Sequence, residues 1–275
     1  MLRIIVDSGS SIKQEEKALY GVDILPLRVQ IDDMDFQDGV DLTTENFYQY
    51  LDAKKEFPKT SLPSLNEAQS LVEQYTESGD DVLILTISSE ISGTYQSLLI
   101  LFQDNPKVIV FDTKLAAGGI RFLVEDALRY KDAPLFTIKE KLEELIPRIV
   151  IMAIPNTLDY LLVGGRLSKA EWMLGTLLSI KPIIGFRNGK VAVLTKKRGL
   201  KQSMQAIVDE VSAQKSDPDF GIIASYTQNK ENVEKLIAMT VPEYRRQVKV
   251  YDNLTPSLAC HWGPNAYGYI FVKST

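Results

Sequence analysis

Short apolar runs alternate with amphipathic segments along the first half of the chain. Runs such as RIIVD at 3–7 and DVLILTI at 81–87 are almost continuously apolar and are followed by polar turns. This pattern is typical of strands in a parallel sheet that helices cover on both faces. It predicts strands at 3–7, within 20–32, at 81–87 and at 107–114, and helices at 42–51, 61–79, 94–103, 116–130 and 137–148, the last beginning at Thr137. The N-terminal region is therefore expected to be a parallel-sheet α/β domain.

Local signals mark the ends of two of these helices. Thr43 or Thr44 is expected to cap the first, because a hydroxyl can accept a hydrogen bond from the free N–H groups of the first turn. Ser64 and Glu67 form a predicted capping box for the next helix, which Gly79 is placed to end.

The second half has a different order of elements. Two β-rich runs flank Asn188-Gly189, the strongest short signal for a hairpin. The pattern also predicts strands at 150–155, 220–226, 247–252 and 266–272, and helices within 158–180, with a glycine break, and at 199–214 and 231–239. This order favours an α+β domain. Since the chain has 275 residues, we expect two domains, 1–150 and 151–275, with Pro147 and Pro155 near the boundary.

Composition narrows the class of protein. Apolar residues make up 45% and charged residues 24%, as in ordinary globular proteins, and no segment reaches the length of a membrane span. The net charge of −5 argues against nucleic acid as a partner, and the basic stretches at 194–201 and 244–249 are read as solvated surface. Without a signal peptide pattern, the expected location is the cytoplasm.

Counts and motifs exclude several chemistries. The single cysteine, Cys260, permits no intrachain disulfide, and one histidine is too few for an HExxH zinc site. Neither a G-x-S-x-G nucleophile motif nor the common nucleotide-binding glycine loops occur. We therefore expect no metal and no cofactor. The same absences disfavour an ordinary hydrolase or nucleotide-driven enzyme and leave an unusual enzyme open.

One stretch has the composition of an anion-binding loop. The segment TISSEISGTYQS at 86–97 follows a predicted strand and spends half its positions on hydroxyls. Such a loop before a helix presents O–H and N–H donors where the helix dipole favours an anion, and Gly93 permits close approach. The alternative is plain capping of the helix by Ser92 or Thr94. Strand ends at 7–8, 88–89 and 112–113 should gather at the same sheet edge.

Three further stretches stand out. Thr60-Ser61 precedes a helix, where it can bind a ligand or simply form a capping loop. GGRLSK at 164–169 places Arg166 beside two glycines, and CHWGPNAYG at 260–268 contains the sole histidine, His261. Each also has a structural interpretation, as a helix break and as a core histidine.

Taken in order, these motifs resemble the DegV family of fatty-acid-binding proteins. The shared marks are an initial strand ending in Asp-Ser and then TSLPS, SSEISGTY, LDYLLVGGR, LLSIKPII with its RNGKV hairpin, and HWGPNAYG, which together cover the whole chain. The N-terminal loop DSGSSI lacks the Asp-Leu-Pro that often follows in that family. Trp262 stands where Thr is common, and could narrow the ligand cavity.

The resemblance implies a two-domain protein that holds one long-chain fatty acid in an apolar tunnel. By this resemblance Thr60, Ser61 and Ser92 would bind the carboxylate with the Gly93 N–H, and His261 would lie near it. Arg166 would lie at the tunnel mouth. The partner implied is an ATP-dependent fatty acid kinase that makes an acyl phosphate for phospholipid synthesis, and transient membrane contact is left open.

Two alternatives and two extensions of the carrier function remain at this stage. An acyl-ester hydrolase would use Ser92 as nucleophile and His261 as base, with Asp7, Asp112 or Asp252 as the orienting acid. A sensor of small anions would need no apolar tunnel. Two hypotheses extend the carrier function: that His261 titrates near pH 6.5 and tunes affinity, and that Arg166 with KKR at 196–198 docks the kinase.

Overall fold

The chain forms two compact units. The computed structural model describes residues 1–54, 56–175 and 179–275. Unit 1 consists of Met1–Pro147 with Thr255–Ser257, and unit 2 of Arg148–Leu254 with Leu258–Thr275. Three residues late in the sequence thus belong to the first unit, a return that no pattern in the sequence indicated.

Unit 1 is built on a parallel sheet with the order β2-β1-β6-β7. Its strands are β1 (Leu2–Asp7), β2 (Val22–Leu25), β6 (Asp81–Thr86) and β7 (Val108–Asp112). All three pairings are parallel, and β1 lies between β2 and β6. The predicted parallel-sheet α/β domain is confirmed. Because β1, β6 and β7 are neighbours, their carboxyl ends meet at one edge, as the sequence predicted.

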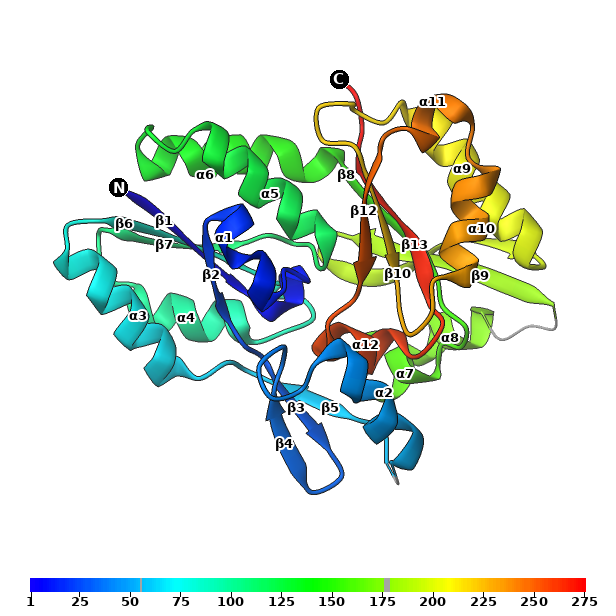
Figure 1. The fold of residues 1–275 in the computed structure, drawn as a ribbon, viewed down its shortest axis with the longest axis horizontal. Helices are drawn as coiled ribbons and strands as arrows, with labels where there is room; N and C mark the ends of the chain where they lie inside the picture. The colour runs from blue at the N-terminus through cyan, green and yellow to red at the C-terminus, as the bar shows by residue number, and fades with distance from the viewer. Residues whose placement is uncertain (55, 176–178) are drawn as a thin grey trace. The chain divides into compact units, whose positions relative to one another are not determined.

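Helices cover both faces of this sheet. The helices along this part of the chain are α1 (Lys17–Tyr20), α2 (Thr44–Ala53), α3 (Leu65–Glu77), α4 (Thr94–Phe102), α5 (Gly118–Arg129) and α6 (Leu135–Leu145), with short 3-10 turns η1 (Ser8–Ser10), η2 (Gln14–Glu16) and η3 (Ile146–Arg148). Four of them cover the parallel sheet. Figure 1 shows α3 and α4 on one face of the sheet and α5 with α6 on the other. Ala68 and Val72 of α3 and Leu98 of α4 pack on Ile5 and Ile84 of the strands.

The helix ends follow the predicted chemistry in part. Thr43 caps α2, accepting a hydrogen bond from the Asn46 N–H, and Ser64 caps α3 by accepting from the Glu67 N–H at 3.2 Å. The Glu67 carboxylate accepts from the Gln37 side chain. Helix α6 begins at Leu135 rather than Thr137, because Pro134 already provides the extended residue before the first turn.

A second sheet in unit 1 is small and antiparallel, with the order β4-β3-β5. Its strands are β3 (Arg28–Ile31), β4 (Met34–Gln37) and β5 (Lys59–Ser61). Neither β4 nor β5 was predicted. Both are short and polar, so pairing with β3 rather than their own sequence makes them strands.

Unit 2 is built on a six-stranded mixed sheet with the order β10-β9-β8-β13-β11-β12. Its strands are β8 (Ile149–Ile154), β9 (Ile180–Arg187), β10 (Lys190–Arg198), β11 (Ile222–Tyr226), β12 (Val248–Asn253) and β13 (Tyr267–Val272). Only the pair β11 and β12 is parallel among the pairings described. The predicted hairpin is confirmed, since Asn188 and Gly189 both have positive φ, at 51° and 81°.

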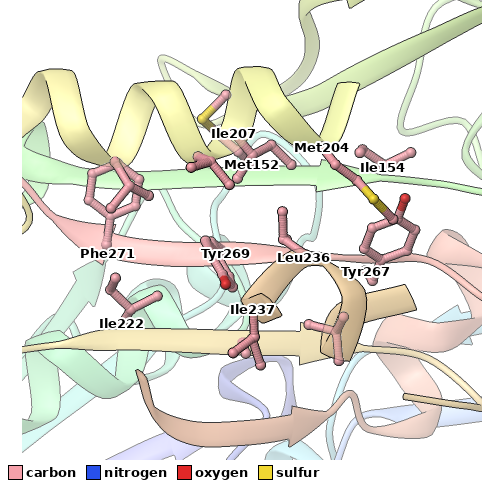
Figure 2. Packing of buried hydrophobic residues seen from close by; sticks show 14 of the residues in the cluster. Met152, Ile154, Met204, Ile207, Ile222, Leu236, Ile237, Tyr267, Tyr269 and Phe271 are labelled. Atoms are coloured by element: carbon pink, nitrogen blue, oxygen red, sulfur yellow. The ribbon is translucent and has the colours of Figure 1, made fainter. Parts of the chain in front are cut away.

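Helices of unit 2 pack a large apolar core against this sheet. They are α7 (Asp159–Val163), α8 (Lys169–Gly175), α9 (Leu200–Gln214), α10 (Glu231–Met239), α11 (Pro242–Arg245) and α12 (Pro256–Trp262), whose first two residues belong to unit 1. Figure 2 shows Ile207 of α9 beside Met152 of β8, and Met204 of α9 beside Ile154 of β8 and Tyr267 of β13. The α+β character predicted for this region is confirmed.

The predicted helical stretch at 158–180 is interrupted as expected. Gly164 and Gly165 separate α7 from α8, and Gly165 has a positive φ of 73°. Residues 176–178 of that prediction lie outside the described residues. No helix in the described parts of the chain is both long and apolar enough to span a membrane.

Candidate functional site

The end of β1 is tied to the loop that follows β6. The Asp7 carboxylate accepts hydrogen bonds from the Gly9 N–H at 2.9 Å and from the Ile87 N–H at 2.8 Å. Burial raises the pKa of Asp7 to about 7, although these two N–H donors oppose the rise. Asp7 thus fixes the start of the hydroxyl-rich loop against the neighbouring strand.

The end of β7 holds the same loop from the other side. Asp112 accepts from the Ser89 N–H at 3.0 Å and pairs with Lys114 Nζ at 2.7 Å, and Lys114 also donates to Ser89 Oγ at 2.9 Å. Burial alone would raise the pKa of Asp112, but hydrogen bonds from Lys114 and Ser89 outweigh it and hold the pKa below its usual value. The Ser89 hydroxyl is therefore occupied within the loop.

Ser92 lies at the start of α4 and is half-buried. Its Oγ accepts from the Thr94 N–H at 3.3 Å and lies 2.9 Å from Thr94 Oγ1. The residue at the N-cap itself is Gly93, which makes no side-chain cap. A hydroxyl has one donor and two acceptor positions, so Ser92 keeps its O–H for a ligand when Thr94 is the donor of that pair.

The Thr60 segment adjoins this loop. Thr60 is half-buried in β5, paired with Val29 of β3, and Ser61 is exposed. A Cβ built on Gly93 would lie 3.4 Å from Leu62 Cδ2, so the two motifs touch in unit 1. The structure thus brings Thr60-Ser61 and Ser92-Gly93 to neighbouring segments. The alternative, in which Thr60-Ser61 only forms a capping loop, is not supported, because Thr60 lies in β5 and Ser64 caps α3.

Gly93 is not required by the local fold. Its φ is −76°, which any residue adopts, and its Cβ would meet nothing closer than Leu62 at ordinary contact distance. A glycine without a conformational or packing need fits the prediction that something approaches this backbone closely.

The sole histidine lies in unit 2, on a helix that was not predicted. His261 belongs to α12, whose sequence PSLACHW begins with proline and lacks a clear polar face. Burial, followed by the nearby positive charge of Arg166, lowers the pKa of His261 to about 3. This low pKa argues against the hypothesis that the side chain changes charge near pH 6.5, and it predicts a neutral imidazole at neutral pH.

Two glycines let the motifs of unit 2 pack together. A Cβ on Gly164 would lie 2.4 Å from His261 Nδ1, and one on Gly263 would lie 2.5 Å from Tyr160 Cδ2. No other residue fits either place without displacement. The GGR and HWGP motifs, far apart in sequence, are thus in direct contact.

Arg166 follows that glycine pair and is half-buried rather than a surface arginine. Its guanidinium donates to the Gly164 carbonyl, and its backbone N–H donates to the Leu161 carbonyl at 2.9 Å. Burial lowers its pKa. The other part of the expected docking patch, Lys196 to Arg198, is exposed on β10.

The six predicted site residues thus fall into two sets. Thr60, Ser61, Ser92 and Gly93 belong to unit 1, whereas Arg166 and His261 belong to unit 2. Trp262, which the sequence flagged, is buried in unit 2.

Sequence reasoning missed the acid and cation that support the hydroxyl loop. Asp112 was noted as a strand end and as one candidate orienting acid, but not as a support for this loop, and Lys114 was not considered. Lys114 has a positive φ of 56°, an uncommon conformation for a residue with a side chain, and a signal that sequence does not carry. Among the described residues, no group of three or more His, Cys, Asp or Glu side chains is arranged to hold a metal ion.

Comparison with known proteins identifies the family. The family model described as uncharacterised protein, DegV family, matches residues 1–274. A DegV domain-containing protein of Caldanaerobacter subterraneus subsp. tengcongensis is 31% identical over 279 residues, covering 99% of both chains. The chain therefore belongs to the DegV family.

Solved structures agree with this assignment. The crystal structure of a fatty acid binding DegV family protein from Streptococcus agalactiae has a TM-score of 0.90 at 28% identity, covering 100% of this chain and 99% of that one. The Fatty Acid Kinase (Fak) B3 protein of Streptococcus pneumoniae, loaded with linoleic acid, shares the fold with a TM-score of 0.81 at 21% identity, covering 99% of each chain.

Proposed function

We propose that this protein binds one long-chain fatty acid and presents it to an ATP-dependent fatty acid kinase. The hydroxyls of Thr60, Ser61 and Ser92 and the Gly93 N–H hold the carboxylate. An apolar tunnel holds the hydrocarbon tail of the fatty acid. The observation that carries the proposal is the contact between the Thr60 and Ser92 segments through Leu62 and Gly93, in a fold shared with fatty-acid-binding relatives.

The energetics suit such a ligand. Each buried methylene contributes about 0.8 kcal/mol, so a tail of roughly fourteen offers about 11 kcal/mol. Association and ordering cost an estimated 4–15 kcal/mol, and a hydrogen bond to a charged group adds about 1.5–3 kcal/mol. The tail therefore supplies most of the affinity, and the hydroxyls determine the position of the carboxylate end of the ligand.

Neutral donors also fit a carrier that must release its ligand's head group to a reaction elsewhere. Serine and threonine hold a carboxylate by hydrogen bonds, without the stronger attraction of a desolvated lysine. His261, neutral because of its low pKa, can contribute a hydrogen bond without adding a full charge.

The hydrolase alternative has less support. A histidine whose pKa is about 3 is a weak general base near neutral pH. Of the candidate orienting acids, Asp7 already accepts from two backbone N–H groups and Asp112 pairs with Lys114. Both carboxylates therefore already have partners at the sheet edge, which makes them poor candidates to orient His261.

The first experiment is mass spectrometry of an organic extract from purified protein, followed by titration of the delipidated protein with palmitate and oleate. We expect a stoichiometric fatty acid, and an affinity that falls about 10-fold or more in Ser92→Ala through loss of one charged hydrogen bond. Ser70→Ala, an exposed hydroxyl on α3, is the matched control and should bind as wild type. A clean extract with no uptake of either acid would refute the carrier function, and a small polar ligand in the extract would favour an anion sensor.

Kinase presentation needs a separate test. Charge reversal at Arg166 and at Lys196 to Arg198 should slow acyl phosphate formation by the kinase while fatty acid affinity stays within about twofold. If affinity and kinase turnover fall together, the patch supports the ligand site rather than docking.

A further inference from the structure

Unit 1 contains a polar cavity apart from the hydroxyl loop. It lies among the segments after β1 and β4 and the returning Thr255, with Ser8, Asp38, Thr44 and Thr255 in its wall. Its volume of about 90 Å³ is several times the 10–15 Å³ or so that one water molecule needs. The cavity therefore has room for a small hydrated solute.

Asp38 is the most deeply buried acid in this wall. Its exposed fraction is 1%, and its backbone N–H donates to the Leu27 carbonyl at 2.9 Å. Burial raises the pKa of Asp38 to about 6, and the nearby hydroxyls of Ser257, Ser8 and Thr255 oppose the rise.

These hydroxyls surround the carboxylate without completing its hydrogen bonding. Neither oxygen of Asp38, nor Ser257 Oγ, makes a hydrogen bond of ordinary distance and angle with any residue in the described parts of the chain. Thr255 Oγ1 instead donates to the Ser8 carbonyl at 3.1 Å. Three buried polar atoms that lie near one another without hydrogen bonds of ordinary geometry indicate a bound water or ion.

The charge balance favours a cation. Asp38 lies close enough for its charge to raise the pKa of Asp7, whose oxygens already accept hydrogen bonds from the Gly9 and Ile87 N–H groups. Two buried acids therefore lie near one another at this place. The cavity wall also contains one basic residue, Lys13, and two further acids, Glu15 and Glu45. One carboxylate with several hydroxyl oxygens is a donor set for a hard ion rather than a transition metal.

We propose that this cavity binds a monovalent metal cation, sodium or potassium, with Asp38 as its charged ligand and the hydroxyls of Ser8, Thr255 and Ser257 as neutral ligands. A single charge matches the single available carboxylate. The sequence prediction of no metal rested on counts of cysteine and histidine, which do not bear on an oxygen-ligated ion. The proposal is independent of the proposed function.

Bound cation would hold the returning segment Thr255–Ser257 in unit 1. This segment leads directly into the part of α12 that carries His261. Ion binding should therefore be visible as thermal stabilisation of the whole chain.

The test is thermal unfolding in sodium, potassium or tetramethylammonium chloride at equal ionic strength and neutral pH. We expect a saturable rise in Tm of about 2 °C or more with sodium or potassium relative to the bulky ammonium ion, from binding to the folded state alone. Asp38→Asn should abolish the response. Asp33→Asn, which removes an exposed charge in the same hairpin, should keep it.

A direct measurement does not depend on variants. Crystals of the wild type grown with rubidium or thallium(I) chloride should show an anomalous scattering peak beside Asp38. Equal Tm values in all three salts, an unchanged response in Asp38→Asn, or no anomalous peak in the cavity would each overturn the proposal, and would assign water to the cavity.

Discussion

Unit 1 and unit 2 hold their candidate residues in place by different means. In unit 1, Asp7 and Asp112 hold the hydroxyl loop through directed hydrogen bonds to the backbone N–H groups of Ile87 and Ser89. In unit 2 the candidate residues are held by close packing against glycines. Because Gly164 has no side chain, His261 can approach its backbone within van der Waals contact. Directed bonds tolerate small changes in side-chain volume, whereas close packing against a glycine does not.

The same contrast appears in the interiors. Among the described residues, the bulkiest fully buried side chain is Arg121 of unit 1, which donates to Glu16 at 2.8 and 2.9 Å and to the Ser11 carbonyl. The core of unit 2 is mainly aliphatic and aromatic (Figure 2). Its Tyr269 hydroxyl is paired with the Thr240 hydroxyl at 2.8 Å. Unit 1 therefore depends more on satisfied charge, and unit 2 on filled volume.

The largest effect is expected from breaking the buried ion pair of unit 1. Glu16→Gln leaves the Arg121 charge buried without its partner, so we expect a loss of about 3–5 kcal/mol in the free energy of unfolding. Denaturant unfolding measures it. Glu143→Gln removes the same kind of pair from the exposed face of α6, where Lys139 and Glu143 lie 2.5 Å apart, and should cost about 0.5 kcal/mol. Equal losses would show that unit 1 does not rely on this buried charge.

A smaller effect should separate the two glycines. Gly164→Ala places a methyl group against His261 and the Tyr160 carbonyl, so we expect a loss of about 1–3 kcal/mol in stability. Gly93→Ala has room and an ordinary φ, and should cost less than about 1 kcal/mol. Fatty acid titration sharpens the comparison. Weaker binding by Gly93→Ala, at near wild-type stability, would support close approach of the ligand to its backbone, and unchanged binding would contradict it.

The smallest effect concerns pH. Because the folded pKa of His261, about 3, lies below its unfolded value of 6.5, the folded state binds fewer protons in between, and His261 lowers stability only as the pH falls through that range. In the folded protein the imidazole is neutral at any pH well above its folded pKa of about 3. We therefore expect fatty acid affinity to change by less than about twofold from His261 titration between about pH 5 and 8. Calorimetric titration of wild type and His261→Gln tests this: a pH-dependent step in wild type that the variant lacks would show that His261 does titrate.

Much of the fold was predictable because its information is local. Apolar runs of β1, β6 and β7, the Asn188-Gly189 turn and the caps at Thr43 and Ser64 each depend on neighbouring residues, and all match the structure. The gathering of strand ends followed from the same pattern, since parallel strands share one carboxyl edge.

What the sequence by itself determined was the class of both units, the position of most elements and the family, together with the residues that the family motifs single out. Tertiary structure alone decided that β5 is a strand, that His261 lies on a helix and stays neutral, and that Asp38 is buried beside Ser257. The physical reason is that pairing with a distant strand, desolvation and contact between segments more than two hundred residues apart depend on the folded environment. The local sequence QDGV does not predict whether its aspartate, Asp38, is exposed to water or buried near serine and threonine hydroxyls.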